Sequence, residues 1–155
     1  MRKDIKRIND TIKKASIILD VKDRYICMKK NGKLDVNATA KKIESLYSAY
    51  AQKELIQEIG FELFDDFLEL IQSVENICTK DLVLIAKKMR ENQEPVFIKD
   101  LAITGNDLMN IGYSGKEIGI ALKYLIQIVH KDMRYNDKQK LLEISKKAYK
   151  EIENL

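Results

Sequence analysis

Apolar residues recur every three or four positions along most of the chain, which is the spacing of one face of an α-helix. The first segment shows it most regularly, at Ile5, Ile8, Ile12, Ala15 and Leu19. A single proline interrupts the 155 residues, and no pair of alternating segments flanks a convincing hairpin turn. The pattern predicts an all-α protein: a single helical, bundle-like domain of about six to eight helices with no sheet.

Capping residues and glycines predict where the helices begin and end. We expect a first helix over residues 2–19 and a long helix capped by Asn37 that ends near Gly60. The intervening RYICMKKNGKLDV fits either a short helix or an extended segment that turns at Asn31-Gly32. Two further helices are expected, one over residues 61–73 and one that follows Thr79 and stops at ENQEP.

Charge is distributed unevenly along the chain. Residues 1–33 hold eleven Lys or Arg and four Asp, a net charge of +7, whereas residues 34–155 have a net charge of −3. We therefore divide the sequence into a basic helical segment (1–36), a helical body (37–94) and a glycine-punctuated tail (95–155), packed as one compact unit. Of the 28 basic residues 23 are lysines, so phosphate contacts would be point charges rather than bidentate forks.

Several classes of protein are disfavoured by what the sequence lacks. No apolar run approaches the roughly 20 residues that a membrane span needs, and the start, MRKDIKRIND, has no apolar signal segment. We therefore expect a cytoplasmic protein without a membrane partner. Cys27 and Cys78 are expected to be reduced and mostly buried thiols, and with one histidine they do not make up a usual zinc site.

Four of the six glycines fall between Asp100 and Leu122, inside what otherwise reads as helix. We expect Asn106 to cap a short helix, and Ser114 to cap the next one in a capping box with Glu117. Gly105, Gly112 and Gly115 would then lie at helix boundaries, where glycine is favoured. The second of these helices is expected to run to about Met133, and a last helix to begin near Asn136.

Gly119 differs from the other three because it lies inside the predicted helix. A glycine there costs about 1 kcal/mol relative to alanine. We therefore expect another backbone to approach Gly119 closely, with the preceding short helix as its neighbour.

The boundary at residues 112–116 also has a possible function. The start of a helix presents unpaired N–H groups and a partial positive charge, which suit a phosphate. Lys116 would add a full charge there, and Lys123 follows two turns later. The alternative is a tight helix–turn–helix that binds nothing.

The tail resembles the C-terminal region of bacterial CCA-adding enzymes, which are tRNA nucleotidyltransferases of the poly(A) polymerase superfamily. The resemblance lies in KDLAITGNDL, GKEIGIALKYLIQIV and NDKQKLLEI. The family pattern, D-L-x-I-x-G-x-D-L, then G-x-x-I-G-x-x-L, then N-x-x-x-x-L-L, is matched at Asp100, Leu101, Ile103, Gly105, Asp107, Leu108, Gly115, Ile118, Gly119, Leu122, Asn136, Leu141 and Leu142.

The resemblance extends more loosely upstream and covers about residues 40–147. KKIESLYSAYAQKELIQEIGFELFDDFLEL is similar to the preceding helices of the family. The family often continues from Leu-Glu-Leu into Arg-Ala-Asp, whereas this chain has Ile71-Gln72-Ser73 after Leu70.

The resemblance implies that this region binds the acceptor–TΨC side of tRNA through phosphate and shape contacts. The implied partner is tRNA, together with a separate nucleotidyltransferase head domain or a second copy of the chain. From the residues themselves we expect the phosphate contacts at Lys99, Gly105, Asn106, Ser114, Gly115, Lys116 and Lys123, and in second place at Lys87, Lys88 and Arg90.

The catalytic elements of that family are not found in this sequence. Its Gly-Ser loop and Asp-x-Asp pair belong to the head, and so would Mg²⁺ and CTP or ATP. Asp65 and Asp66 diverge by about 100° on a helix and cannot readily share a metal, and His130 has no nucleophile placed to pair with it. We therefore expect no catalytic residue, no metal site and no cofactor in this chain.

A second hypothesis remains open beside tRNA binding. The acidic balance of residues 34–155 also suits an α-helical protein-interaction or dimerisation domain that kept the fold without RNA binding, because RNA binders usually have a basic face. A contiguous lysine patch around Gly115 would favour RNA, and lysines interleaved with acids would favour interaction. Residues 1–36 could themselves be a dimerisation helix.

Overall fold

The computed structural model describes residues 2–73 and 77–153. These residues form seven α-helices and three short 3₁₀ helices, and no strand lies among them. The all-α class and the number of helices are therefore confirmed. Met28 and Leu34 form an isolated antiparallel bridge across the Asn31-Gly32 turn, so the ambiguous segment is extended rather than helical.

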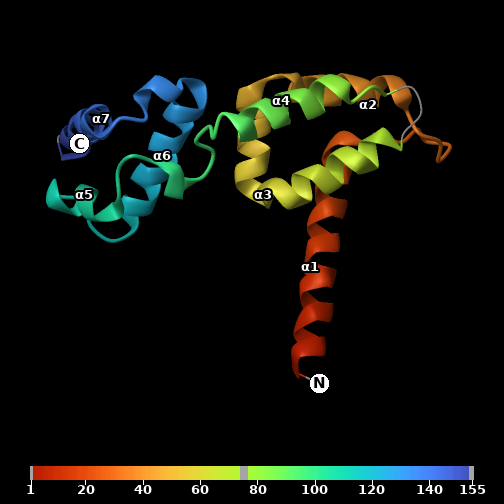
Figure 1. The fold of residues 1–155 in the computed structure, drawn as a ribbon, viewed down its shortest axis with the longest axis horizontal. Helices are drawn as coiled ribbons and strands as arrows, with labels where there is room; N and C mark the ends of the chain where they lie inside the picture. Colours follow the sequence, from red (N-terminus) through yellow and green to blue (C-terminus); the bar gives the residue numbers. More distant parts are fainter. Residues whose placement is uncertain (1, 74–76, 154–155) are drawn as a thin grey trace. The chain divides into compact units, whose positions relative to one another are not determined.

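The chain divides into two compact units, Met1–Asn92 and Gln93–Leu155. The basic segment and nearly all of the body belong to the first unit, and the glycine-punctuated tail forms the second. Figure 1 shows the first unit in red to green and the second in green to blue.

The first unit contains four α-helices and one 3₁₀ helix: α1 (Arg2–Tyr25), α2 (Val36–Ile43), η1 (Glu44–Tyr47), α3 (Ala49–Gln72) and α4 (Lys80–Glu91). Asp35, not Asn37, caps α2, since its carboxylate accepts the Ala38 N–H at 3.1 Å. The predicted long helix is broken by η1, and Ser48 starts α3. At Gly60 the backbone leaves the helical conformation, with φ 85°, so the predicted helix end near Gly60 is seen as a kink that divides α3 into two helical stretches.

Leucine, isoleucine and phenylalanine side chains from η1, α3 and α4 form the core of the first unit. Phe64, Phe67 and Ile56 of α3 have no exposed surface. The buried Gln52 amide donates to the carbonyls of Leu46 at 2.8 Å and Leu82 at 3.2 Å. A buried amide that bridges two segments in this way fixes their relative position, because leaving its buried N–H groups without a partner would be costly.

Helix α1 packs on α3 only through its second half. Val21 is its one fully buried residue, and Tyr25 packs against Phe67 with 5.3 Å between the ring centroids. Lys14 pairs with Glu62 at 3.1 Å, and Arg24 donates to Glu58 at 2.8 Å. Residues 2–16 are all exposed, and Figure 1 shows this half of α1 extending beyond α2, α3 and α4.

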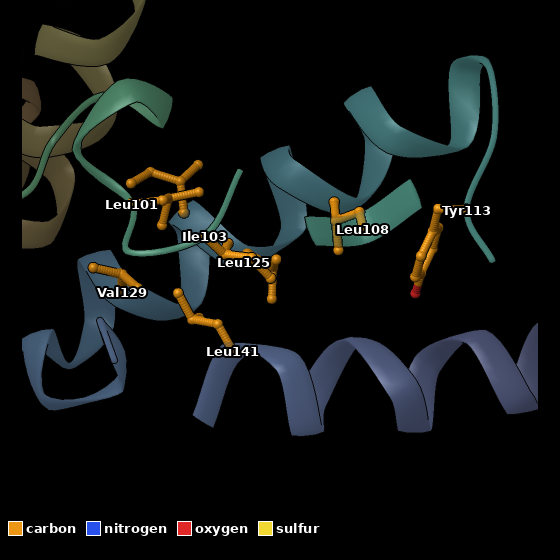
Figure 2. Packing of buried hydrophobic residues seen from close by; sticks show 8 residues of the cluster. Leu101, Ile103, Leu108, Tyr113, Leu125, Val129 and Leu141 are labelled. Carbon is orange, nitrogen blue, oxygen red and sulfur yellow. The ribbon is translucent and has the colours of Figure 1, made fainter. Parts of the chain in front are cut away.

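The second unit contains η2 (Ile98–Asp100), α5 (Gly105–Asn110), α6 (Lys116–Lys131), η3 (Met133–Tyr135) and α7 (Lys138–Glu153). Figure 2 shows its core, in which Leu108, Leu125 and Leu141 lie between α5, α6 and α7. The Tyr113 hydroxyl donates to the Ser145 carbonyl at 2.8 Å and so joins the turn before α6 to α7.

The expectation of mostly buried thiols is corrected. Cys78 is exposed and Cys27 is half-buried, so the thiols are not mostly buried.

His130 is 4% exposed and its Nε2 lies 2.7 Å from the Val96 carbonyl oxygen, so it is buried inside the second unit. No helix among the described residues has both the length and the apolar character to cross a membrane.

Candidate nucleic-acid interface

The start of α5 is closed by the protein's own side chains. Thr104, not Asn106, is the capping residue: its hydroxyl accepts the Asp107 N–H at 3.3 Å, and the Asp107 carboxylate accepts the Thr104 N–H at 2.9 Å. The Thr104 N–H and, second to it, the Thr104 hydroxyl, which donates to the same carboxylate at 3.0 Å, hold the pKa of Asp107 below its ordinary value. Lys138 lies 3.4 Å from the same carboxylate. A phosphate contact at Gly105 and Asn106 is not favoured, because a carboxylate already occupies this end.

The start of α6 is more open. Gly115, not Ser114, is the capping residue, with φ 56° and ψ −130°, and no side-chain oxygen caps the helix. Half of the predicted capping box is formed, since the Glu117 carboxylate accepts the Ser114 N–H at 3.3 Å. Only glycine adopts the Gly115 conformation without strain. The exposed first turn therefore has one carboxylate on its side and glycine backbone at its tip.

Gly115, Lys116, Gly119 and Lys123 lie along one face of α6. At 100° per residue, all four fall within about 100° of arc, and Glu117 projects at least 100° away from Lys116 and Lys123. All four are exposed. Across the described chain neither lysine is engaged in an ion pair. We call Gly115, Lys116, Gly119 and Lys123 the glycine–lysine face.

The expected close approach at Gly119 is wrong. A β-carbon built there would meet nothing within 4 Å. The tight contact is at Gly105 instead, where a β-carbon would lie 3.3 Å from Ile118 Cγ2. The short helix α5 does approach α6, but the residue of α6 that faces it is Ile118 rather than Gly119. Packing of the second unit therefore does not account for a glycine at position 119.

The residues expected in second place, Lys87, Lys88 and Arg90, lie on α4 of the first unit, whereas the glycine–lysine face belongs to the second unit. Arg90 pairs with Asp65 at 2.9 Å and covers the Phe61 ring at 4.5 Å. Lys87 lies 3.9 Å from Glu91. Lys88 is exposed on the same helix. Arg90 and Lys87 are thus partly neutralised by their own neighbours.

Lys99 is exposed on η2 of the second unit and lies over the Phe97 ring, 5.4 Å from its centroid. The second unit as a whole has ten Lys or Arg and nine Asp or Glu. Any basic surface on the second unit is therefore confined to a few lysines and does not cover the unit as a whole.

A groove beside the glycine–lysine face has different chemistry. It has a volume of about 420 Å³ and lies between α6 and α7; its lining includes Tyr113, Ile120, Tyr124, Ala148, Glu117 and Glu151. Most of these groups are apolar, and the two charged ones are acidic. The groove is unsuited to phosphate and was not anticipated from the sequence, because its lining comes from residues far apart in the chain.

Among the described residues, no three His, Cys, Asp or Glu side chains gather at metal-binding distance. Asp65 is engaged with Arg90, and His130 lies in the core of its unit.

The apolar positions of the tail pattern hold the second unit together. Leu101, Ile103, Leu108 and Leu141 are buried, and Ile118, Leu122 and Leu142 pack against them.

The polar positions of the pattern tie segments of the same unit to one another. The Asp100 carboxylate accepts the Phe97 N–H at 2.9 Å, and the Asp107 carboxylate completes the capping box of α5. Asn136 accepts the Ala102 N–H at 2.8 Å and donates to the Asp100 carbonyl at 3.0 Å. Among the residues of the pattern, Gly119 is the one for which this unit offers no structural reason.

Comparison with protein-family models, with curated proteins and with solved structures finds no match to this chain. The resemblance to CCA-adding enzymes therefore depends on the residues of the pattern alone.

Proposed function

We propose that this chain is the non-catalytic, tRNA-binding body-and-tail portion of a CCA-adding-type tRNA nucleotidyltransferase. In this proposal the glycine–lysine face meets the phosphate backbone on the acceptor–TΨC side of the tRNA. A head domain on another polypeptide would supply Mg²⁺, CTP or ATP and the chemistry.

The observation that carries the proposal is the exposed, unpacked Gly119 between two lysines. A helical glycine costs stability, and the second unit gains nothing from it in packing. The two glycines bare the backbone on one face of α6, so a phosphate can approach the helix closely. Lys116 and Lys123 then lie on the same side as that phosphate.

The chemistry of the face suits a sequence-independent contact with RNA. Lysines bind phosphates as point charges, and A-form RNA is recognised mostly by its shape and backbone. Tyr124, an exposed aromatic residue next to Lys123, lines the mostly apolar groove between α6 and α7, whose charged groups are acidic, so base stacking is not part of the proposal.

Binding of tRNA to the full chain, measured by filter retention over a series of salt concentrations, tests the proposal. We expect weak binding that falls steeply with salt, because counterions are released when lysines contact phosphates. Lys116→Ala with Lys123→Ala should lower the affinity and reduce the salt slope by about one for each lysine–phosphate pair that is removed.

Lys146→Ala is the matched control, since it removes one exposed lysine from α7 of the same unit. It should leave the affinity and the slope nearly unchanged. Affinity that does not depend on salt, or a double variant that binds like the parent, would refute the proposed interface.

A second candidate is the protein-interaction domain without RNA binding. The near balance of charge in the second unit and the ion pairs of Arg90 and Lys87 favour it, because they leave little free basic surface. Failure to bind tRNA at any salt concentration in the same titration would support this candidate.

A further inference from the structure

Helix α1 has two apolar faces, and only one of them is covered. The covered face, centred on Val21, packs on α3. The other face is the regular stripe of Ile5, Ile8, Ile12, Ala15 and Leu19, which we call the α1 stripe. Its four large side chains are between 54% and 62% exposed. Leu19 and Val21 are two residues apart, which places them about 160° from each other around the helix, so α3 cannot cover the stripe.

The spacing of the α1 stripe is that of a coiled-coil seam. Its residues are separated by three, four, three and four positions, with Ile5, Ile12 and Leu19 at one seam position and Ile8 and Ala15 at the other. A helix that packs against one partner needs a single apolar stripe. The second stripe is therefore suited to a second helix.

The flanks of the stripe indicate which helix that is. On one flank the residues are Arg2, Asn9, Ser16 and Asp23, all exposed. If two copies of α1 pair antiparallel, this flank faces itself in reverse order. Arg2 of one copy then faces Asp23 of the other, and Asn9 faces Ser16.

A parallel pair of the same helices is less complementary. In a parallel pair, the flank with Asp23 would face the other flank of the partner helix, which contains Ile18. The apolar Ile18 side chain of one copy would then lie near the Asp23 carboxylate of the other. The charges of the flanks therefore favour the antiparallel arrangement over the parallel one.

From these observations we propose that the α1 stripe is the interface of a homodimer, in which two copies of α1 pair antiparallel. Ile8 of each copy packs against Leu19 of the other, and Ile12 packs against Ala15, whose small side chain admits it. Both copies use the same surface, so the interface is self-complementary and the assembly is closed at two chains. The seam from Ile5 to Leu19 spans only about two heptads, so we expect the dimer to be reversible. This inference does not depend on RNA binding, which was assigned to the other unit.

Sedimentation equilibrium of the full chain over two decades of concentration tests the inference. The parent chain should pass from monomer to dimer as its concentration rises. Ile8→Asp with Ile12→Asp should stay monomeric at every concentration, and its circular dichroism should show it still folded, because both side chains are exposed in the monomer. Leu84→Asp is the matched control: this residue is 50% exposed on α4, away from the stripe, and its substitution should leave the dimer intact.

Cysteine cross-linking tests the direction of the pairing. In a chain with Cys27→Ser and Cys78→Ser, the pair Ile8→Cys and Leu19→Cys should form a dimer linked by disulfides under mild oxidation, and Ile8→Cys alone should not. Efficient cross-linking of Ile8→Cys alone would indicate parallel helices and overturn the proposal.

Three further outcomes would also overturn the proposed dimer. One is a parent chain that stays monomeric up to its solubility limit. Another is a dimer that survives the double aspartate substitution. The third is a monomer whose stripe binds vesicles of phosphatidylcholine and phosphatidylserine, which would assign the stripe to a lipid surface.

Discussion

Replacing Gly119 with alanine should stabilise the second unit. Gly119 lies within α6, its φ is not positive, and an added β-carbon would meet nothing within 4 Å. The substitution therefore introduces no clash and removes the cost of a helical glycine. The free energy of unfolding should rise by about 1 kcal/mol, the difference in helix propensity between glycine and alanine.

Urea unfolding followed by circular dichroism measures this change. With an m-value of roughly 1–3 kcal/mol per M, the midpoint should move up by about 0.3–1 M. The melting temperature should rise by about 2–4 °C for a chain of this size. Gly105→Ala is the comparison, because its β-carbon would lie only 3.3 Å from Ile118 Cγ2, and it should gain less or lose stability.

The same variant separates stability from function. If a phosphate lies against the backbone at Gly119, Gly119→Ala should bind tRNA more weakly than the parent chain although it is more stable. A variant that is no more stable than the parent would refute the structural reasoning, since it would mean that the face at position 119 is not open. A variant that is more stable and binds tRNA equally well would refute the role of Gly119 in the interface.

Four other substitutions probe the second unit and the thiols. Gly112→Ala should destabilise the second unit, because φ there is 118° and the β-carbon would lie 2.8 Å from the Tyr149 ring; urea unfolding checks this, and an unchanged midpoint would contradict it. Thr104→Ala should cost about 1 kcal/mol of unfolding free energy by removing the α5 cap, and a cost close to zero in the same assay would show that the cap contributes nothing. The pKa of Asp107 is lower in the folded state than its ordinary value of 3.8, so the native state binds fewer protons than the unfolded state. The free energy of unfolding should therefore fall as the pH drops from about that value through the folded pKa. In Asp107→Asn this free energy should fall less steeply with decreasing pH, and an identical pH dependence in parent and variant would rule out this contribution. Cys78 is exposed and Cys27 half-buried, so Cys78→Ser should remove the faster of the two reactions with a thiol reagent, and disappearance of the slower one would reverse the assignment.

Local sequence was sufficient to predict where most helices lie, because helix period and chain breakers act within a few residues. The kink at Gly60 and the turn at Asn31-Gly32 are of this kind. The capping residues were predicted less well: Asp35, Thr104 and Gly115 were missed in favour of Asn37, Asn106 and Ser114. Neighbouring polar residues have similar capping ability, and the backbone path into the helix decides which one faces the free N–H groups.

The candidate interface was predicted in part. Lys116 and Lys123 were selected from their spacing, and the structure leaves both exposed on one face of α6. The amides near Gly105 were selected on the same argument, but Asp107 and Lys138, which lie on two different helices, occupy that end of α5. Thr104 and Asp107 have the spacing of a capping box, which could have shown that this end is closed, whereas no spacing rule reveals the contact of Asp107 with Lys138.

The sequence by itself determined the helical class, because a repeat of three to four residues buries an apolar face only in an α-helix. Tertiary structure alone decided which of those faces are covered. The spacing of Ile5, Ile8 and Ile12 predicted that they share one side of a helix, but not that this side is exposed while Val21 faces α3. Likewise, Ile118 rather than Gly119 meets the neighbouring helix. Periodicity specifies that residues share a side of a helix, whereas the direction of that side depends on how separate helices pack.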